Sequence, residues 1–247
     1  AMHNKSNILK QFDVILCRPS HGGNIGSTAR AMKTMGLTQL CLVQPKKFPT
    51  EESYALAAGA DGILESALIF DSIEEAILKS HIAVGFTARK RELSQPHQNV
   101  RKTAKDLIGA AKNNKIALVF GNETNGLSNN EIKHCQLLCF IDADKNYSSL
   151  NLAQSVQICC HEIRMALDFE NTNPINENQT PKFVTQSQLN GFFLHFEEVL
   201  DSIGYLKKIQ GQRLMQRIRL LFNRTQLDKD EINIMRGIFT EIQKKIK

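Results

Sequence analysis

The amino-acid sequence predicts an α/β fold, in which helices cover both faces of a parallel β-sheet, followed by a small all-α domain. Short apolar segments alternate with helical segments over the first two thirds of the chain, as in parallel sheets buried on both faces. Near the C-terminus, three segments carry apolar residues at i, i+3 and i+4 spacing. This spacing predicts three amphipathic helices.

The first strand is expected at 12–17, which is apolar except for one aspartate. The glycine-rich residues 22–26 are expected to form a turn, and 27–35 a helix that ends at Gly36. Residues 87–99 read as a polar loop. The strand and helix pattern recurs, with further strands expected at 40–43, 67–70, 82–86, 116–120 and 139–141, and helices at 53–58, 73–78, 100–111 and from about residue 151 onward.

A domain boundary is expected near residue 168. Residues 1–168 contain all the predicted strands, and 169–182 are polar and interrupted by prolines, which is typical of a linker. Residues 183–247 form the predicted helical domain, with helices at 186–200, 213–222 and 231–246.

The composition limits the classes of protein to which the chain can belong. The chain has 247 residues, 42% of them hydrophobic, and a net charge of +6, which suits a polyanionic partner such as nucleic acid. There is no apolar signal segment and no run long enough to span a membrane, so we expect a cytoplasmic protein with no membrane partner. The six cysteines never form C-x-x-C, so we expect buried free thiols and no metal site.

Three polar segments stand out: GGNIGSTAR at 22–30, LVFGNETNGL at 118–127 and YSSLNLAQSV at 147–156. The first is not a dinucleotide-binding motif, because its spacing is not G-x-G-x-x-G and 45–47 read Pro-Lys-Lys where a ribose-binding carboxylate is expected. No G-x-x-x-x-G-K-[ST] is present, which excludes a P-loop. Serine pairs often cap helices, so the third segment alone predicts only a helix start.

In this order, N-x-G-x-x-A-R, FGNE-x-x-GL and YSSLNLAQSV resemble the three signature motifs of the SPOUT, or trefoil-knot, RNA methyltransferases. The chain is most similar to the TrmJ branch of tRNA (cytidine/uridine-2′-O-)-methyltransferases, and the similarity extends to 20–21, 29–37, 55–60 and 233–238. The resemblance implies a C-terminal trefoil knot in the sheet domain, a homodimer with the active site at its interface, and S-adenosyl-L-methionine as the cofactor.

The resemblance also implies which residues form the site. Arg30 would act on the ribose 2′-hydroxyl; because arginine stays protonated, we expect it to polarise the oxygen while the proton leaves to phosphate or water. Ser149 would assist by hydrogen bonding, and Asn24 and Glu123 would orient the arginine, although Glu123 is equally suited to cap backbone amides. The implied cofactor-binding residues are Phe86, Thr87, Ala88, Gly121, Ile141, Ser148, Ser149 and Leu150.

Two groups of arginines are candidates for RNA binding. Arg89 and Arg91 follow a predicted strand, and the resemblance gives them an RNA-binding or catalytic role; solvated loop charge is the alternative. Arg213, Arg217 and Arg219 lie on one predicted helix, as a phosphate-binding strip or a solvated face. The balance of eleven Lys and Arg against seven Asp and Glu from residue 183 onward favours tRNA binding by this domain.

The sequence therefore predicts 2′-O-methylation of a ribose in the tRNA anticodon loop, with cytidine or uridine 32 as the target that the family implies. An unpaired loop nucleotide exposes its ribose to a pocket, which a paired stem does not. Three alternatives stay open. They are methylation of another tRNA or rRNA position, an RNA-binding module that has lost catalysis, and a nicotinamide-dependent oxidoreductase.

Overall fold

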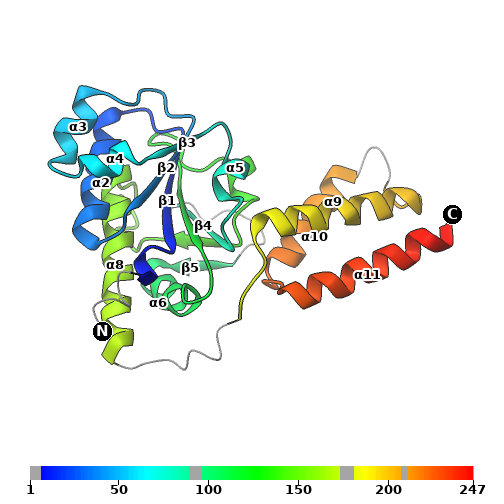
Figure 1. Ribbon diagram of the computed structural model, residues 1–247. Coiled ribbons are helices and arrows are strands. Elements are labelled where there is room, and N and C mark those ends of the chain that lie inside the picture. The colour runs from blue at the N-terminus through cyan, green and yellow to red at the C-terminus, as the bar shows by residue number, and fades with distance from the viewer. Residues whose placement is uncertain (1–6, 89–95, 173–180, 207–210, 247) are drawn as a thin grey trace.

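A parallel β-sheet of seven strands forms the centre of the first domain (Figure 1). The computed structural model describes residues 7–88, 96–172, 181–206 and 211–246. Within them the strand order is β3-β2-β1-β6-β4-β7-β5, and every neighbouring pair is parallel. The strands are β1 Phe12–Cys17, β2 Gln39–Val43, β3 Leu68–Phe70, β4 Ile82–Phe86, β5 His97–Asn99, β6 Ile116–Phe120 and β7 Leu137–Phe140.

Helices cover both faces of this sheet, as predicted. The helices of one face are α2 Gly22–Met35, α3 Glu51–Ala57, α4 Asp61–Glu65, α6 Val100–Ala110 and α8 Leu152–Thr172. The shorter helices α5 Ile73–Ile77 and α7 Asn129–Ile132 cover the other face. Successive side chains of β1 point to opposite faces of the sheet and so contribute to two separate cores. Val14 and Leu16 belong to the core on one face, and Ile15 and Cys17 to the core on the other.

The strand order places later strands between earlier ones. Strand β7 pairs with β4 on one side and with β5 on the other, although both of these come earlier in the sequence. A strand inserted between two earlier strands is the pairing that a C-terminal knot requires. The expected α/β class is therefore confirmed, and the pairing of β7 suits the expected SPOUT arrangement. The sequence pattern did not predict the short elements α4, β5 and α7, and β5 corrects the end of the loop expected at 87–99.

The glycine-rich segment 22–26 is the first part of α2, whereas the sequence analysis expected a turn there. The glycines are explained by packing. A Cβ on Gly26 would collide with the backbone of Ser53, and one on Gly22 would collide with Thr50. Glycine thus lets α2 approach α3 closely, and the helix ends where predicted, at Gly36 with a φ of 86°.

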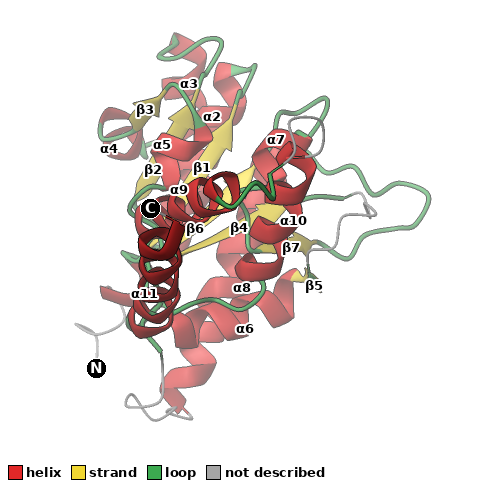
Figure 2. Ribbon diagram, turned by 90° about the vertical axis from the view of Figure 1, so that its right-hand side faces the viewer, coloured by secondary structure: helices red, strands yellow, loops and turns green. Residues whose placement is uncertain are grey.

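The second domain consists of α9 Gln186–Ser202, α10 Gly211–Asn223 and α11 Lys229–Ile246, at the three predicted positions. Figure 1 shows these helices beside the sheet domain, and in Figure 2 they face the viewer. Their core is rich in phenylalanine, and Phe192 contacts the rings of Phe193, Phe196, Phe222 and Phe239.

The junction of the two domains differs from the predicted linker at its start. Helix α8 continues to Thr172, so 169–172 are helical, and an ion pair of 2.6 Å between Lys112 and Glu170 fastens this end. The second domain meets the first through α9. The backbone N–H of Gln186 donates to Ser80, and its side chain bonds to Gln136 at 3.2 Å.

The close approach of α2 and α3 predicts an effect of substitution at Gly26. Gly26→Ala should lower the free energy of unfolding by about 1–3 kcal/mol, because the added methyl group forces the helices apart. Gly109→Ala is the matched control: Gly109 lies in α6 with open space around its Cα, so alanine should be neutral or stabilise by up to about 1 kcal/mol. Urea unfolding measures both, and equal stabilities would contradict the packing argument.

Candidate active site

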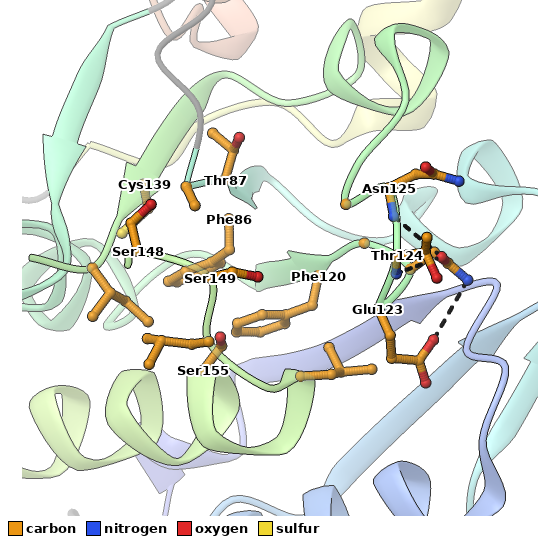
Figure 3. A pocket seen from close by; sticks show the side chains of 17 residues that line it. Phe86, Thr87, Phe120, Glu123, Thr124, Asn125, Cys139, Ser148, Ser149 and Ser155 are labelled. Atoms are coloured by element: carbon orange, nitrogen blue, oxygen red, sulfur yellow. Dashed lines mark hydrogen bonds between the residues drawn. The ribbon is translucent and has the colours of Figure 1, made fainter. Parts of the chain in front are cut away.

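A pocket lies where β4, β6 and β7 end, at the carboxyl edge of the sheet (Figure 3). Ligands of open α/β sheets commonly bind at this edge. The cavity has a volume of about 150 Å³, and all eight residues that the resemblance implies for the cofactor line it. The full lining is Phe86, Thr87, Ala88, Phe120, Gly121, Asn122, Glu123, Thr124, Asn125, Gly126, Cys139, Ile141, Ser148, Ser149, Leu150, Leu152 and Ser155.

The pocket has an apolar floor and a polar rim. Phe86 and Phe120 are register partners on neighbouring strands, and their rings stack with centroids 4.3 Å apart. Ser148 and Ser149 are exposed at the rim, and among the described residues their hydroxyls have no hydrogen-bond partner. A Cβ on Gly121 would collide with the backbone of Gly126 and Leu127, so glycine is needed for the loop to close against β6.

The carboxylate of Glu123 is the main hydrogen-bond acceptor beside this pocket. It accepts from the backbone N–H of Ser20 at 3.0 and 3.2 Å, from the Ser20 hydroxyl at 2.7 Å and from the backbone N–H of His21 at 3.3 Å. The side-chain amide of Asn24 donates to it at 3.0 Å. Glu123 therefore holds the start of α2 against the end of β6.

Asn24 extends this network to the third motif. Its side-chain oxygen accepts from the amide of Asn151 at 2.9 Å, and the Asn151 oxygen accepts from the backbone N–H of Ala153, also at 2.9 Å. Asn151 thus caps the start of α8 while it contacts α2. The three motifs, far apart in the sequence, meet through a continuous series of hydrogen bonds.

Arg30 lies on α2, is exposed, and does not line the pocket. Its side chain makes no ion pair or hydrogen bond with the described part of the chain. Asn24 and Glu123 contact each other and the backbone near Ser20, so within one chain neither orients Arg30. Of the two roles considered for Glu123, the contacts favour the binding of backbone amides.

The arginines expected to bind RNA differ in environment. Arg89 and Arg91 lie outside the described residues. Arg213 and Arg217, one turn apart on α10, are both exposed. Arg219 is different: its guanidinium lies 4.5 Å from the ring centre of Phe193 and 3.4 Å from the Asn190 oxygen, and burial lowers its pKa. Arg219 belongs to the packing of the helical domain.

Several residues of the site were not identified from the sequence. Ser20 and Asn151 stood within or beside the motifs, but no rule of spacing marked them as partners of Glu123 and Asn24. Arg18 and Glu131 form a bidentate pair at 2.8 and 2.9 Å across 113 residues, and no sequence signal indicated it.

The described ranges contain no group of three or more His, Cys, Asp or Glu residues arranged to hold a metal. None of the helices in the described ranges is both long and apolar enough to cross a membrane. The six cysteines are buried free thiols, as predicted.

Comparison with known proteins decides the family. The family model described as SpoU rRNA Methylase family matches residues 11–161, which is more than half of the chain. The chain belongs to the SpoU methylase family. A second model, the C-terminal domain of the tRNA methyltransferase TrmJ, matches 187–247 and places this SpoU methylase in the TrmJ branch.

Three relatives illustrate the similarity of this SpoU methylase to TrmJ proteins. It is 40% identical to the tRNA (cytidine/uridine/adenosine-2′-O-)-methyltransferase TrmJ of Pseudomonas aeruginosa, over 96% of this chain and 95% of that protein. It is 39% identical to the tRNA (cytidine/uridine-2′-O-)-methyltransferase TrmJ of Yersinia pestis, over 97% and 94%. The crystal structure of TrmJ from Z. mobilis aligns with a TM-score of 0.81 at 27% identity, covering 94% of this chain and 98% of that chain.

The contacts of Glu123 predict a pH-dependent contribution to stability. Burial acts to raise the pKa of Glu123, but the hydrogen bonds from Asn24 and Ser20 outweigh it and lower the pKa from 4.5 to about 2. A lowered pKa in the folded state stabilises the fold above the unfolded pKa, and this contribution is lost as the pH falls from about 4.5 toward about 2.

We therefore expect Glu123→Gln to lower the free energy of unfolding by about 1–2 kcal/mol at about pH 7, and by less at about pH 3. Glu65→Gln is the control, since Glu65 is exposed and its side chain makes no hydrogen bond within the described residues. The effect of this substitution should stay within about 0.5 kcal/mol at both pH values. Denaturant unfolding at the two pH values measures the difference. A Glu123→Gln effect that is independent of pH would contradict the assigned contacts.

Proposed function

We propose that this protein transfers a methyl group from S-adenosyl-L-methionine to the 2′-oxygen of a ribose in tRNA. The observation that carries the proposal is the meeting of all three motifs at one pocket, in a chain that belongs to a methyltransferase family. The names of the TrmJ relatives support the tRNA substrate and the 2′-oxygen as acceptor.

The pocket fits the proposed cofactor. An adenosine ring needs an apolar surface, which the Phe86 and Phe120 floor and Leu150 provide, and its ribose and amino-acid parts need polar groups. The hydroxyls of Ser148 and Ser149 at the rim are available for this purpose. When bound, the cofactor supplies an electrophilic methyl group on a sulfonium.

The residues of the chain have two tasks in the reaction. They hold the ribose oxygen in line with the methyl group, which can contribute about 7–11 kcal/mol in well-oriented systems, and they stabilise the charge on the oxygen as its proton leaves. Ser149 lines the pocket, which supports its proposed role of hydrogen-bonding the hydroxyl. Arg30 supplies the positive charge, and since it does not line the pocket of its own chain, a homodimer would bring it beside the partner subunit's pocket.

Nucleotide 32 of the anticodon loop is the proposed target. The names of the relatives include cytidine and uridine, and one also includes adenosine, which fits recognition by ribose geometry. Because the proposed substrate is tRNA, the proposed location of the enzyme is the cytoplasm.

Transfer of the methyl group from labelled S-adenosyl-L-methionine to tRNA transcripts tests the position. A transcript with 2′-deoxyribose at nucleotide 32 should accept no label, while one with 2′-deoxyribose at nucleotide 34 should accept it normally. Equal labelling of both would exclude position 32.

The proposed role of Arg30 predicts a separation of binding and catalysis. Arg30→Ala should lower kcat by at least about 100-fold while the dissociation constant of S-adenosyl-L-methionine changes little, because the guanidinium acts on the ribose oxygen. Lys33 lies three residues after Arg30 on α2 and is also exposed. Lys33→Ala is therefore the control and should keep wild-type kcat. Calorimetry and single-turnover labelling provide the two measurements, and normal turnover by Arg30→Ala would contradict the role.

The helical domain is proposed to bind the tRNA backbone through α10. Replacing both Arg213 and Arg217 by alanine should weaken tRNA binding and reduce the slope of log affinity against log salt by up to about 2, since two phosphate contacts are lost. Arg219→Ala should instead lower the thermal stability of the helical domain, because this side chain packs on Phe193. An unchanged salt slope in the double variant would require another role for the exposed arginines.

A further inference from the structure

Arg18 follows β1 directly, at the carboxyl edge of the sheet. Its backbone has a φ of 53°, in the left-handed region that residues other than glycine seldom adopt. The backbone N–H of Arg18 donates to Val43 at 2.7 Å, which fixes this conformation beside β2. The turn directs the carbonyl and the side chain of one residue toward the loop that follows β6.

Both groups of Arg18 bind the segment 122–131, which consists of this loop and the start of α7. The carbonyl oxygen accepts from the side-chain amide of Asn122 at 2.8 Å. The guanidinium donates from Nε and Nη2 to the two oxygens of Glu131, at 2.9 and 2.8 Å. Asn122 and Glu131 are the ends of a segment that includes Glu123, Thr124, Asn125 and Gly126, which line the pocket.

The Glu131 side chain is held in place by burial and by a second hydrogen bond. Its side chain is only 8% exposed, and it also accepts from the backbone N–H of Ser128 as part of the capping box of α7. Burial acts to raise the pKa of Glu131, but the hydrogen bonds from Arg18 and Ser128 keep it below its ordinary value. Glu131 is therefore ionised, and its two hydrogen bonds with Arg18 join a charged donor to a charged acceptor.

The segment between the two anchors is closed by its own contacts. The backbone N–H of Gly126 donates to the Asn122 carbonyl at 2.8 Å, and Thr124 donates to the Asn122 side chain at 2.9 Å. These bonds close residues 122–126 into one turn. Its position relative to Phe86 and Phe120 depends on its contacts with the rest of the chain, which are those of Glu123 with Ser20 and Asn24 and those of Asn122 and Glu131 with Arg18.

We propose that Arg18 is a positioning residue, which sets the wall of the cofactor pocket by holding Asn122 through its carbonyl and Glu131 through its guanidinium. The inference rests on the proposed function, since it names S-adenosyl-L-methionine as the molecule that this wall contacts. Arg18 itself does not line the pocket, so its effect passes through the 122–131 segment.

The test uses Arg18→Met, Glu131→Gln and the double variant in the full-length protein. Methionine keeps much of the apolar stem, and glutamine retains the acceptor for Ser128 and hence the cap of α7. Each single variant should bind S-adenosyl-L-methionine roughly ten-fold more weakly by calorimetry, and the double variant about equally weakly, because both remove one interaction. Hydrogen exchange of the 122–131 amides, measured without cofactor, should accelerate in all three.

Arg101→Met is the matched control, because Arg101 pairs with Glu162 at 3.1 Å between α6 and α8, away from the 122–131 segment. It should change neither measurement. Unchanged exchange and unchanged affinity in Arg18→Met would overturn the proposal, as would additive losses in the double variant.

The Arg18 side chain is 35% exposed, so a direct contact with RNA phosphate is the competing explanation. If Arg18→Met lowered only the tRNA affinity and its salt slope, with normal cofactor affinity and exchange, the positioning role would be overturned. Titration of the wild type with S-adenosyl-L-methionine distinguishes a failure of the proposed function from a failure of the role of Arg18. If the wild type failed to bind S-adenosyl-L-methionine, the proposed function would fail, while the exchange data would still decide whether Arg18 holds the loop.

Discussion

The Glu123 carboxylate joins parts of the chain that are about a hundred residues apart, and the pocket depends on this contact. It binds the backbone N–H groups of Ser20 and His21 and the side chain of Asn24, and Asn24 in turn binds Asn151. A carboxylate is suited to this task because two oxygens can accept several donors at once. Without it, the loops after β1 and β6 and the start of α8 would lack a common point of attachment.

The sheet provides the rigid base for this network. Parallel pairing in register brings Phe86 beside Phe120, and the glycines of α2 allow that helix to lie close to α3 with its first turn next to Glu123. Asn24 lies in that first turn. The packing of α2 and the geometry of the site are therefore linked, and a change in the α2–α3 contact would also move Asn24.

Much of the fold was predictable from sequence because apolar strands and amphipathic helices leave strong local patterns. The five longer strands and the helices of the second domain followed from such patterns, and the eight residues expected to bind the cofactor followed from the motifs. Segment 22–26 was predicted as a turn because glycine usually disfavours helix, and only the position of α3 explains why a helix forms there. Strand β5 has no apolar pattern, since His97, Gln98 and Asn99 pair with β7 through the backbone.

The contacts between side chains distant in the sequence were not predictable. Arg219 stands two residues after Arg217, which places it on another side of α10, but its packing on Phe193 depends on how α9 and α10 meet. The partners of Glu123 and Arg18 likewise depend on the sheet order, which brings β1 beside β6. Sequence spacing shows the chemistry that a site can hold, and topology decides which of its groups meet.

The pocket at the carboxyl edge of the sheet is proposed to serve 2′-O-methylation of tRNA, and one measurement tests this most directly. Mass spectrometry of total tRNA from a strain that lacks this gene should show the loss of one ribose methylation in the anticodon loop. The modification should return on complementation with the wild-type gene and stay absent with the Arg30→Ala gene. An unchanged set of ribose methylations in the deletion strain would contradict the account.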